Sequence, residues 1–480
     1  MQPVEQKPLE PKRPPDRDVL KDLVKEPDKS VNKFDLVLAS FQRLLRRGAI
    51  TNLVKMLGRM HPADIAKVME HLSSTKEKRT VFELVRGEAQ RGQVLSELDA
   101  ENIGLVLADL PPAEVAGLLK DLGTDDVAYL LGVLPEARLQ DILTLMKTED
   151  STEIAGLLKY PKDTAGSIMT TEFFSMSENA TAQEAIGRLQ QTTDAEMVFY
   201  IYVTDMDDHL VGVLSLRQLL TVPPATSLKH IMTRDVISVA VDMDQEEVSR
   251  QVARYNLLAV PVVDKEQKLA GIITVDDVVD VIREEATEDM LKMAGAAEDT
   301  LLKSSSVEAA RVRFPWLFTN LAGSLLSGLI LWYFRHTIQE VVAIVSFIPV
   351  IAAMGGNVGL QSSTLIIRGL ATGSIELADI WKVFFREVRI GVLLGIACGL
   401  LLTGVGWLWH GQWVLGTVVG VSLMIAFFVS TSMATIMPIL LKRLGVDPAV
   451  AAGPFVTTAN DITGISIYLA LSTALLDHLK

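Results

Sequence analysis

The chain has 480 residues, of which 49% are hydrophobic, and its formal net charge is −14. This acidic balance argues against nucleic acid as a partner, because phosphate binding needs a basic face. A single cysteine, Cys398, excludes an internal disulfide. The length allows several domains, and the apolar residues are concentrated after about residue 310.

The N-terminal part divides into a tail and a helical region. Residues 1–33 are rich in proline and charge, which predicts a disordered tail. Residues 34–160 contain a loose repeat of about a dozen residues, as in "HPADIAKVMEHL", "DAENIGLVLADL", "PPAEVAGLLKDL" and "PEARLQDILTLM". Each copy begins with a cap-like residue and continues with apolar positions at helical spacing. These patterns predict an all-α domain of repeated helices.

Residues 161–282 contain a second internal repeat. Each copy predicts a short strand, a helix, an apolar strand, a turn, a glycine-led strand and a helix. The most specific part reads Gly271-Ile-Ile-Thr274-Val-Asp-Asp277 in the second copy and Gly212-Val-Leu-Ser215-Leu-Arg217-Gln218 in the first. These stretches resemble a tandem pair of CBS domains, an α/β module. The resemblance implies a regulatory role and a tendency to dimerise.

The CBS resemblance also implies a nucleotide site, in which the acid that ends the motif often holds the ribose. The second copy has Asp277 at this position, whereas the first has Gln218. The replacement weakens the prediction of bound ATP, with Tyr200 and Arg217 remaining as candidate contacts.

Residues 283–310 predict an acidic connecting helix. Carboxylates recur at three- and four-residue steps and share one face, at Asp277, Asp280, Glu284 and Glu288, with Glu285 and Asp289 beside them. Like charges on one face destabilise a helix unless cations screen them. A solvated surface is the ordinary interpretation of such a run. Its place between a sensor-like module and the apolar region favours Mg²⁺ sensing.

Residues 311–480 predict an all-α transmembrane domain. Five apolar segments reach the length of about 20 residues that spans a bilayer, at 314–334, 341–367, 387–409, 413–441 and 449–476. Basic residues gather in the loops on the side of the soluble half, so the N-terminus is predicted to be cytoplasmic and the C-terminus outside.

The fifth span carries one carboxylate, Asp461, at its centre, although a buried charge in a membrane is costly. Gly453, Thr457, Gly464 and Tyr468 fall on the same helical stripe. The stripe favours a water-filled path, and the alternative is a buried aspartate that bridges helices.

The second span contributes "PVIAAMGGNVGLQSSTLIIRG". Pro349 and the Gly355–Gly356 pair are expected to weaken helical hydrogen bonding and free carbonyls, although glycines also serve close helix packing. Asn357 and Gln361 lie one turn apart on one face. Oxygen ligands without nearby Cys or His suit Mg²⁺ or Ca²⁺. Five spans are few to ring a pore, which favours a homodimer.

This order of parts resembles the MgtE family of magnesium transporters or channels, from about residue 34 to 476. The specific motifs are Gly355-Gly-Asn357-Val-Gly359-Leu-Gln361 and Asp461-Ile-Thr-Gly464. The resemblance implies a homodimer in a bacterial inner membrane, with the second and fifth spans lining the pore. It further implies that Asp461 holds hydrated Mg²⁺ and that Thr457 offers its carbonyl. The family often has Asn where this chain has Gly453.

The same resemblance implies a set of regulatory Mg²⁺ ligands, namely Asp244, Glu246, Asp277, Asp280, Glu285, Glu288 and Asp289. A further sensor aspartate of the family aligns with Asn256. In the N-terminal domain Asp125 and Asp126 match an acidic turn, while Tyr129 stands where another acid is expected.

The function expected is a Mg²⁺-selective channel or transporter that moves Mg²⁺ into the cytoplasm and closes when cytosolic Mg²⁺ binds the acids. Two alternatives are a broader path for Co²⁺ and Ni²⁺, and a membrane-anchored CBS signalling protein without a pore. An enzyme is not expected, because the seven histidines show no spacing of a nucleophile and a base.

Overall fold

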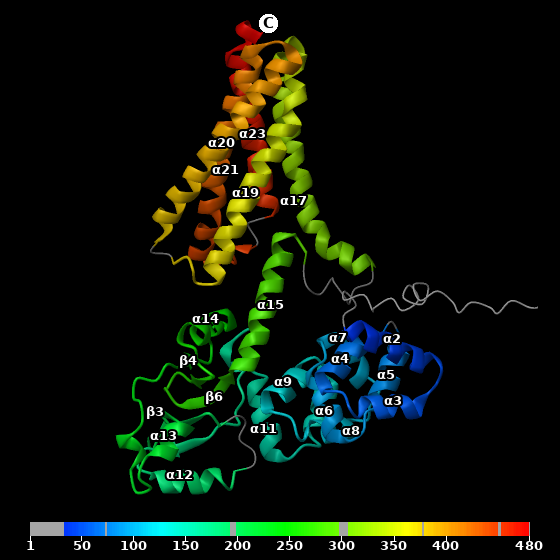
Figure 1. Ribbon diagram of the computed structural model, residues 1–480, viewed down its shortest axis with the longest axis vertical. Helices are drawn as coiled ribbons and strands as arrows, with labels where there is room; N and C mark the ends of the chain where they lie inside the picture. The colour runs from blue at the N-terminus through cyan, green and yellow to red at the C-terminus, as the bar shows by residue number, and fades with distance from the viewer. Residues whose placement is uncertain are drawn as a thin grey trace, which may run out of the picture. The chain divides into compact units, whose positions relative to one another are not determined.

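The computed structural model describes residues 33–72, 74–192, 198–296, 306–376, 379–449 and 453–479 (Figure 1). It divides into two units, Met1–Lys159 and Tyr160–Lys480. The predicted tail lies outside the described residues, apart from Lys33, which begins the first helix.

The described part of the first unit is all-α, which confirms the predicted helical repeats. Two helix starts show the predicted caps: Nδ1 of His61 accepts from the amide of Ala63 at 3.3 Å, and Oδ1 of Asp99 accepts from that of Asn102 at 2.7 Å. The helices are α2 (Lys33–Arg46), α3 (Ile50–Leu57), α4 (Pro62–Glu70), α5 (Thr75–Leu84), α6 (Glu88–Ser96), α7 (Ala100–Leu107), α8 (Pro112–Leu119), α9 (Thr124–Gly132), α10 (Glu136–Leu143) and α11 (Thr148–Leu157).

The predicted CBS pair forms two small three-stranded sheets of the same design. The first contains β1 (Ser175–Ser177), α12 (Ala182–Leu189), β2 (Tyr200–Thr204), β3 (Leu210–Ser215) and α13 (Leu216–Thr221). The second contains β4 (Val239–Ala240), α14 (Gln245–Tyr255), β5 (Ala259–Val263) and β6 (Leu269–Thr274). In each sheet the first two strands are parallel and the last two antiparallel. The motif glycines take equivalent registers, Val203 opposite Gly212 and Val262 opposite Gly271.

The connecting helix α15 runs over Val275–Met293, so it starts eight residues earlier than position 283. It follows β6 directly, and the stretch contains no Gly or Pro to end it. Gly295 then has a φ of +70°, which stops the helix. Part of the predicted range 283–310 lies outside the described residues.

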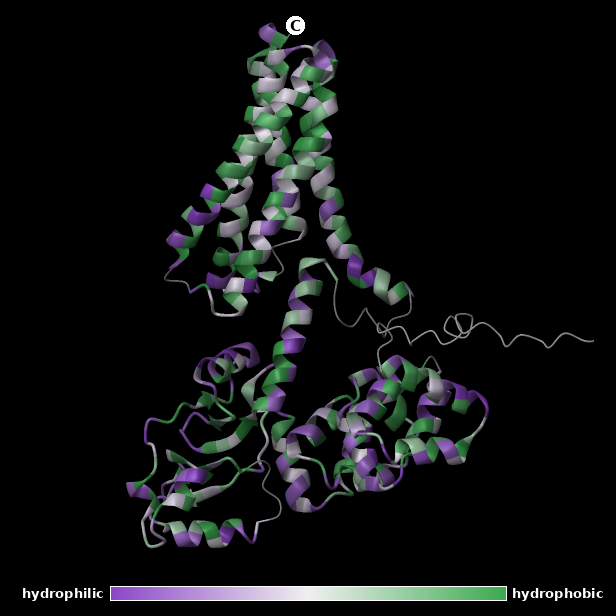
Figure 2. Cartoon of the chain, viewed as in Figure 1, coloured by the Kyte–Doolittle hydropathy of each residue, from purple (hydrophilic) through white to green (hydrophobic). Residues whose placement is uncertain are grey.

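The C-terminal region is helical and largely apolar, as Figure 2 shows. Four described helical segments are long and apolar enough to cross a membrane, at Ala309–Tyr333, Val342–Ala371, Ile380–His410 and Trp413–Arg443. They comprise α17 (Ser306–Tyr333), η3 (Val342–Phe347) with α19 (Ile348–Ala371), α20 (Ile380–His410) and α21 (Trp413–Arg443). The short α18 (Arg335–Glu340) precedes η3. The fifth predicted span appears as α23 (Pro454–Ala474), which is not among the four because polar residues interrupt it. A short α24 (Leu476–Leu479) follows.

Helix α19 is continuous, so Pro349 and the glycine pair do not break it. Pro349 lies in the first turn, where a missing amide hydrogen leaves no intrahelical bond unmade.

Helix α23 packs against α17, α19 and α21. Tyr468, at the end of the predicted polar stripe, does not face a water-filled path. Its ring is fully buried, and its hydroxyl donates to the carbonyl of Ile344 at 3.0 Å. This end of α23 is a packed core.

Candidate functional site

Helices α19 and α23 meet through the glycine motif of α19. A Cβ added at Gly356 would lie 3.6 Å from Cγ2 of Thr457, and one at Gly464 would lie 3.5 Å from Cγ2 of Ile351. Residue numbers rise along one helix as they fall along the other, so the two helices run antiparallel. Two of the motifs expected to form the pore are therefore side by side, with the glycines permitting the close approach.

Asp461 is partly buried on α23, one turn after Thr457. Among the described residues, none contributes a hydrogen bond or an ion pair to its carboxylate. The hydroxyl of Thr457 donates to the carbonyl of Gly453 at 3.0 Å. A carboxylate with free oxygens, next to a hydroxyl and backbone carbonyls, offers the hard oxygen ligands that Mg²⁺ prefers.

Asn460 is a polar residue of this region that the sequence did not single out. Its side chain is 2% exposed, and Nδ2 donates to the carbonyl of Gly355 at 3.4 Å. The hydroxyl of Ser430 on α21 donates to the same carbonyl at 2.7 Å. The glycine pair thus offers a carbonyl to side chains, as expected, without a break in the helix. These bonds join α19, α21 and α23 beside Asp461.

Asn357 and Gln361 point away from these contacts. Both side chains are exposed on α19 in the single chain, one turn apart. The structure does not bring them to Asp461 through any contact among the described residues. Side-chain amides on a membrane helix are unfavourable in contact with lipid. The face of α19 that carries Asn357 and Gln361 is therefore expected to contact a polar partner or water.

The connecting helix ends against the start of α23. A Cβ added at Gly453 would lie 2.5 Å from the carbonyl oxygen of Met293, the last residue of α15. Only glycine permits this distance.

Several of the predicted regulatory acids come together where α14, α15 and the C-terminal end of α19 meet. Burial raises the pKa of Glu285 to about 7. A hydrogen bond from Gln245 lowers this pKa, while the charges of Glu288, Glu246 and Asp244 raise it further. Burial also raises the pKa of Asp289 to about 6, and Asp447 and Glu246 raise it further, while Lys292 and Arg368 oppose the rise. Burial is the larger cause of both shifts, and the neighbouring carboxylates add to it.

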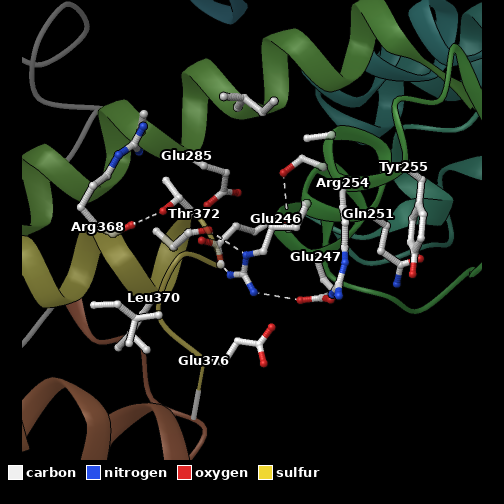
Figure 3. A pocket seen from close by; sticks show the side chains of 18 of the residues that line it. Glu246, Glu247, Gln251, Arg254, Tyr255, Glu285, Arg368, Leu370, Thr372 and Glu376 are labelled. Atoms are coloured by element: carbon white, nitrogen blue, oxygen red, sulfur yellow. Dashed lines mark hydrogen bonds and ion pairs between the residues drawn. The ribbon is translucent and has the colours of Figure 1, made fainter. Parts of the chain in front are cut away.

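A cavity of about 1140 Å³ lies beside these acids. Figure 3 shows Glu246, Glu247 and Glu285 on one side of it, and Arg368 and Thr372 at the end of α19. Residues of the second CBS repeat and of the second predicted span therefore line the same cavity.

Lys292 ties α15 to the segment before α23. Its Nζ lies 2.7 Å from Oδ2 of Asp447 and 2.7 Å from Oε1 of Glu288. Burial alone lowers the pKa of Lys292, but the bonds to Asp447 and Glu288 outweigh burial and raise it. The predicted ligand Glu288 therefore already has a cation partner.

The other predicted regulatory acids have local roles or lie apart. Asp244 caps α14, accepting from the amide of Glu246 at 2.8 Å. Asp277 accepts from the hydroxyl of Thr274 at 2.5 Å at the start of α15. Asp280 is exposed on α15, about 13 Å along the helix from Asp289 by the rise per residue.

The remaining predicted residues occupy turns and helix starts. Asn256 ends α14 with a φ of +51°, a left-handed conformation that Asn tolerates well. Asp125 and Asp126 lie in the first turn of α9, where carboxylates favour the helix dipole, and Tyr129 is exposed on the same helix.

The candidate nucleotide residues surround a helix cap. Tyr200 begins β2 and pairs with Ser215, and Arg217 lies in α13. The amide oxygen of Gln218 accepts from the backbone N–H of Ser215 at 2.8 Å and from its hydroxyl at 2.9 Å. Gln218 thus completes the cap of α13.

One further group of described residues has metal-ligand spacing: Asp205, Asp207 and His209. The carboxylate of Asp205 already accepts from the amides of the other two. Asp264 makes the same turn in the second repeat, accepting from the amide of Lys268 at 2.9 Å. A shared turn accounts for the group.

Comparison with known proteins agrees with this arrangement. Family models match the chain as "MgtE intracellular N domain" over residues 60–163, as "CBS domain" over 165–224 and 228–284, and as "Divalent cation transporter" over 348–471. The magnesium transporter MgtE of Thermus thermophilus is 42% identical over 330 residues, which cover 68% of this chain and 73% of the relative. The chain belongs to the MgtE family. It is therefore a membrane protein of a magnesium-transport family.

Other relatives point the same way. The magnesium transporter MgtE of Bacillus subtilis is 39% identical, with 67% of this chain and 72% of the relative covered. A solved structure, the cytosolic domain of the Mg²⁺ channel MgtE in complex with ATP, is 36% identical to the matched part of this chain. The match covers 51% of this chain and 99% of the solved chain. The TM-score of this match is 0.48.

Proposed function

We propose that this MgtE-family protein is a homodimeric, Mg²⁺-selective channel or transporter of the bacterial inner membrane. It moves Mg²⁺ into the cytoplasm, with its N-terminus cytoplasmic and its C-terminus outside. The observation that carries the proposal is Asp461, a partly buried carboxylate on a helix packed against the glycine motif of α19. Mg²⁺ sites in proteins use one or two carboxylates and keep several waters. Two copies of Asp461 across a two-fold axis would supply that number.

The proposed pore site comprises Asp461, the carbonyls of Thr457 and Gly453, and the amides of Asn357 and Gln361. The exposure of the two amides supports a second copy, because it places them on a face that a partner would cover. In the dimer they would orient the waters around the ion.

Gating is proposed to depend on the acids of the cytoplasmic part. At low Mg²⁺ the carboxylates repel one another, by about 1 kcal/mol per pair at 4 Å in water and several times more where shielded. At high Mg²⁺ the ions bridge the acids, draw the domains together and close the path. The proposed ligands are Asp244, Glu246, Asp277, Asp280, Glu285, Glu288 and Asp289, with Asp125 and Asp126 in the N-terminal domain.

Flux of Mg²⁺ into proteoliposomes tests the pore proposal. Asp461→Asn should abolish flux while the dimer remains folded, as judged by its elution volume. Asp477→Asn, in the terminal α24, is the matched control and should leave flux unchanged. Normal flux in Asp461→Asn sinks the assignment. If liposomes that contain the unchanged protein take up no Mg²⁺, the result favours a membrane-anchored signalling protein. If they take up Co²⁺ or Ni²⁺ as fast as Mg²⁺, the result favours a broader cation path.

A combined variant tests the gating proposal. Neutralising Asp277, Asp280, Glu285, Glu288 and Asp289 should remove both inhibition by Mg²⁺ and protection from protease by Mg²⁺. If the variant still closes at the same Mg²⁺ concentration, the acids form only a solvated surface.

ATP stands outside this proposal. Gln218 replaces the acid of the first repeat and its amide oxygen is engaged with Ser215. Calorimetry with ATP, comparing the unchanged chain with Gln218→Asp, measures what that replacement does.

A further inference from the structure

The C-terminus of α19 is capped by groups from distant parts of the chain. The last carbonyls of a helix have no partner within it and need donors from elsewhere. The carbonyl of Leu370 accepts from Nζ of Lys442 on α21 at 3.2 Å. The carbonyl of Ala371, the last residue of α19, accepts from Nε of Arg250 at 2.7 Å. Both donors are cations, which suit the negative end of the helix dipole.

Arg250 belongs to α14 of the second CBS repeat, 121 residues before its acceptor. Its guanidinium is held on its own helix by Glu247, at 2.8 Å from Nη1, and by Glu246 at Nη2. The side chain is only 21% exposed. A planar guanidinium with five donors can make all three contacts at once, and the two carboxylates fix its direction.

We infer that Arg250 is a positioning residue: through its hydrogen bond to Ala371, the position of the second CBS repeat determines whether the last turn of α19 is held. This coupling needs no metal ion. This inference rests on the proposed function, because α19 carries the amides proposed for the pore. When α14 lies against the membrane helices, Ala371 keeps its donor and the last turn of α19 is held. When α14 moves away, the carbonyl loses the donor and the turn is released.

Arg250 and Mg²⁺ therefore stabilise the same arrangement. Glu246 is both a partner of Arg250 and a proposed Mg²⁺ ligand, so the bridge and the ion site share one carboxylate. Mg²⁺ at the acids keeps α14 near α15 and the membrane helices, which is the arrangement in which Arg250 reaches Ala371. Without the arginine, a higher Mg²⁺ concentration is needed to hold α14 against α15 and the membrane helices.

The test is the Mg²⁺ concentration that halves flux through the full-length protein in proteoliposomes. Arg250→Gln should raise it about tenfold or more, as expected for a lost charge-assisted hydrogen bond, while flux without inhibitory Mg²⁺ is unchanged. Arg250→Lys should give an intermediate value. Arg254→Gln is the matched control, one turn along α14 and lining the same cavity, and should behave like the unchanged protein. An unchanged or lowered concentration in Arg250→Gln overturns the inference.

Hydrogen–deuterium exchange provides a readout that does not depend on transport. In the full chain at high Mg²⁺, Arg250→Gln should speed exchange in the last turn of α19, and Arg254→Gln should not. Equal exchange in the two variants overturns the inference. If the unchanged protein transports no Mg²⁺ but Arg250→Gln alone still speeds exchange in the last turn of α19, the proposed function is wrong and the coupling of α14 to α19 is supported.

Discussion

Gly453→Ala tests the contact between the connecting helix and α23 with the smallest possible change. The new Cβ would lie 2.5 Å from the carbonyl oxygen of Met293, whereas ordinary contacts begin at 3.4 Å. Because the clash is with a backbone atom, the end of α15 or the start of α23 must shift to accommodate the methyl group. Backbone atoms cannot rotate away as a side chain could.

Such overpacking costs about 1–3 kcal/mol, and about 1.4 kcal/mol is a factor of ten in an equilibrium. If Mg²⁺ closes the path by holding α15 against α23, Gly453→Ala should raise the Mg²⁺ concentration for half-inhibition of flux by about fivefold or more. The assay is Mg²⁺ uptake into proteoliposomes with Mg²⁺ titrated on the side that carries the CBS repeats.

Gly404→Ala on α20 is the matched control, because a Cβ there meets nothing within 4 Å. It should leave the Mg²⁺ dependence unchanged. An unchanged dependence in Gly453→Ala as well would refute the reasoning, since it would mean that Met293 does not rest on Gly453 in the inhibited protein.

Three other outcomes follow from the site. Because the pKa values of Glu285 and Asp289 are raised to about 7 and about 6, the ion-free packing of these acids is favoured at low pH and weakens as pH rises through those values. The ionised fraction of Glu285 then goes from about 9% at about pH 6 to about 91% at about pH 8. Because ion-free packing is lost as these acids ionise, the Mg²⁺ needed for half-inhibition should rise over this interval, by up to about tenfold before solvent screening reduces the effect, and a pH-independent titration would contradict this. Asn357→Leu should cut flux or change cation preference, and unaltered flux and preference would reduce this amide to a packing role. Asn460→Ala should lower the thermal stability in detergent by about 1 kcal/mol, because it removes one donor to Gly355, and an unchanged melting temperature would show that the bond contributes nothing.

Local patterns were enough to predict most of the fold. The repeated CBS motif gave both small sheets, since each strand and turn is specified by nearby residues. The helix predicted at the end of the second repeat and the predicted connecting helix form one continuous helix, α15, because no breaker lies between Val275 and Met293. Apolar length predicted the spans, and α23 is set apart by the polar residues around Asp461.

The site was only partly predictable from the sequence. Asp461 stood out because a carboxylate in an apolar segment needs a reason. Asn460, its neighbour, gave no such signal: its role depends on which face of α23 meets α19. Lys292 and Asp447 are 155 residues apart, and no local pattern pairs them.

The bridge from Arg250 to Ala371 also has a consequence for how this protein can vary during evolution. Its acceptor is a main-chain carbonyl, which every residue type supplies equally. Position 371 can therefore change without breaking the bridge, while Arg250 is constrained together with Glu246 and Glu247. Methods that detect contacts from correlated substitutions would find the pairs within α14 but would miss the link from α14 to α19.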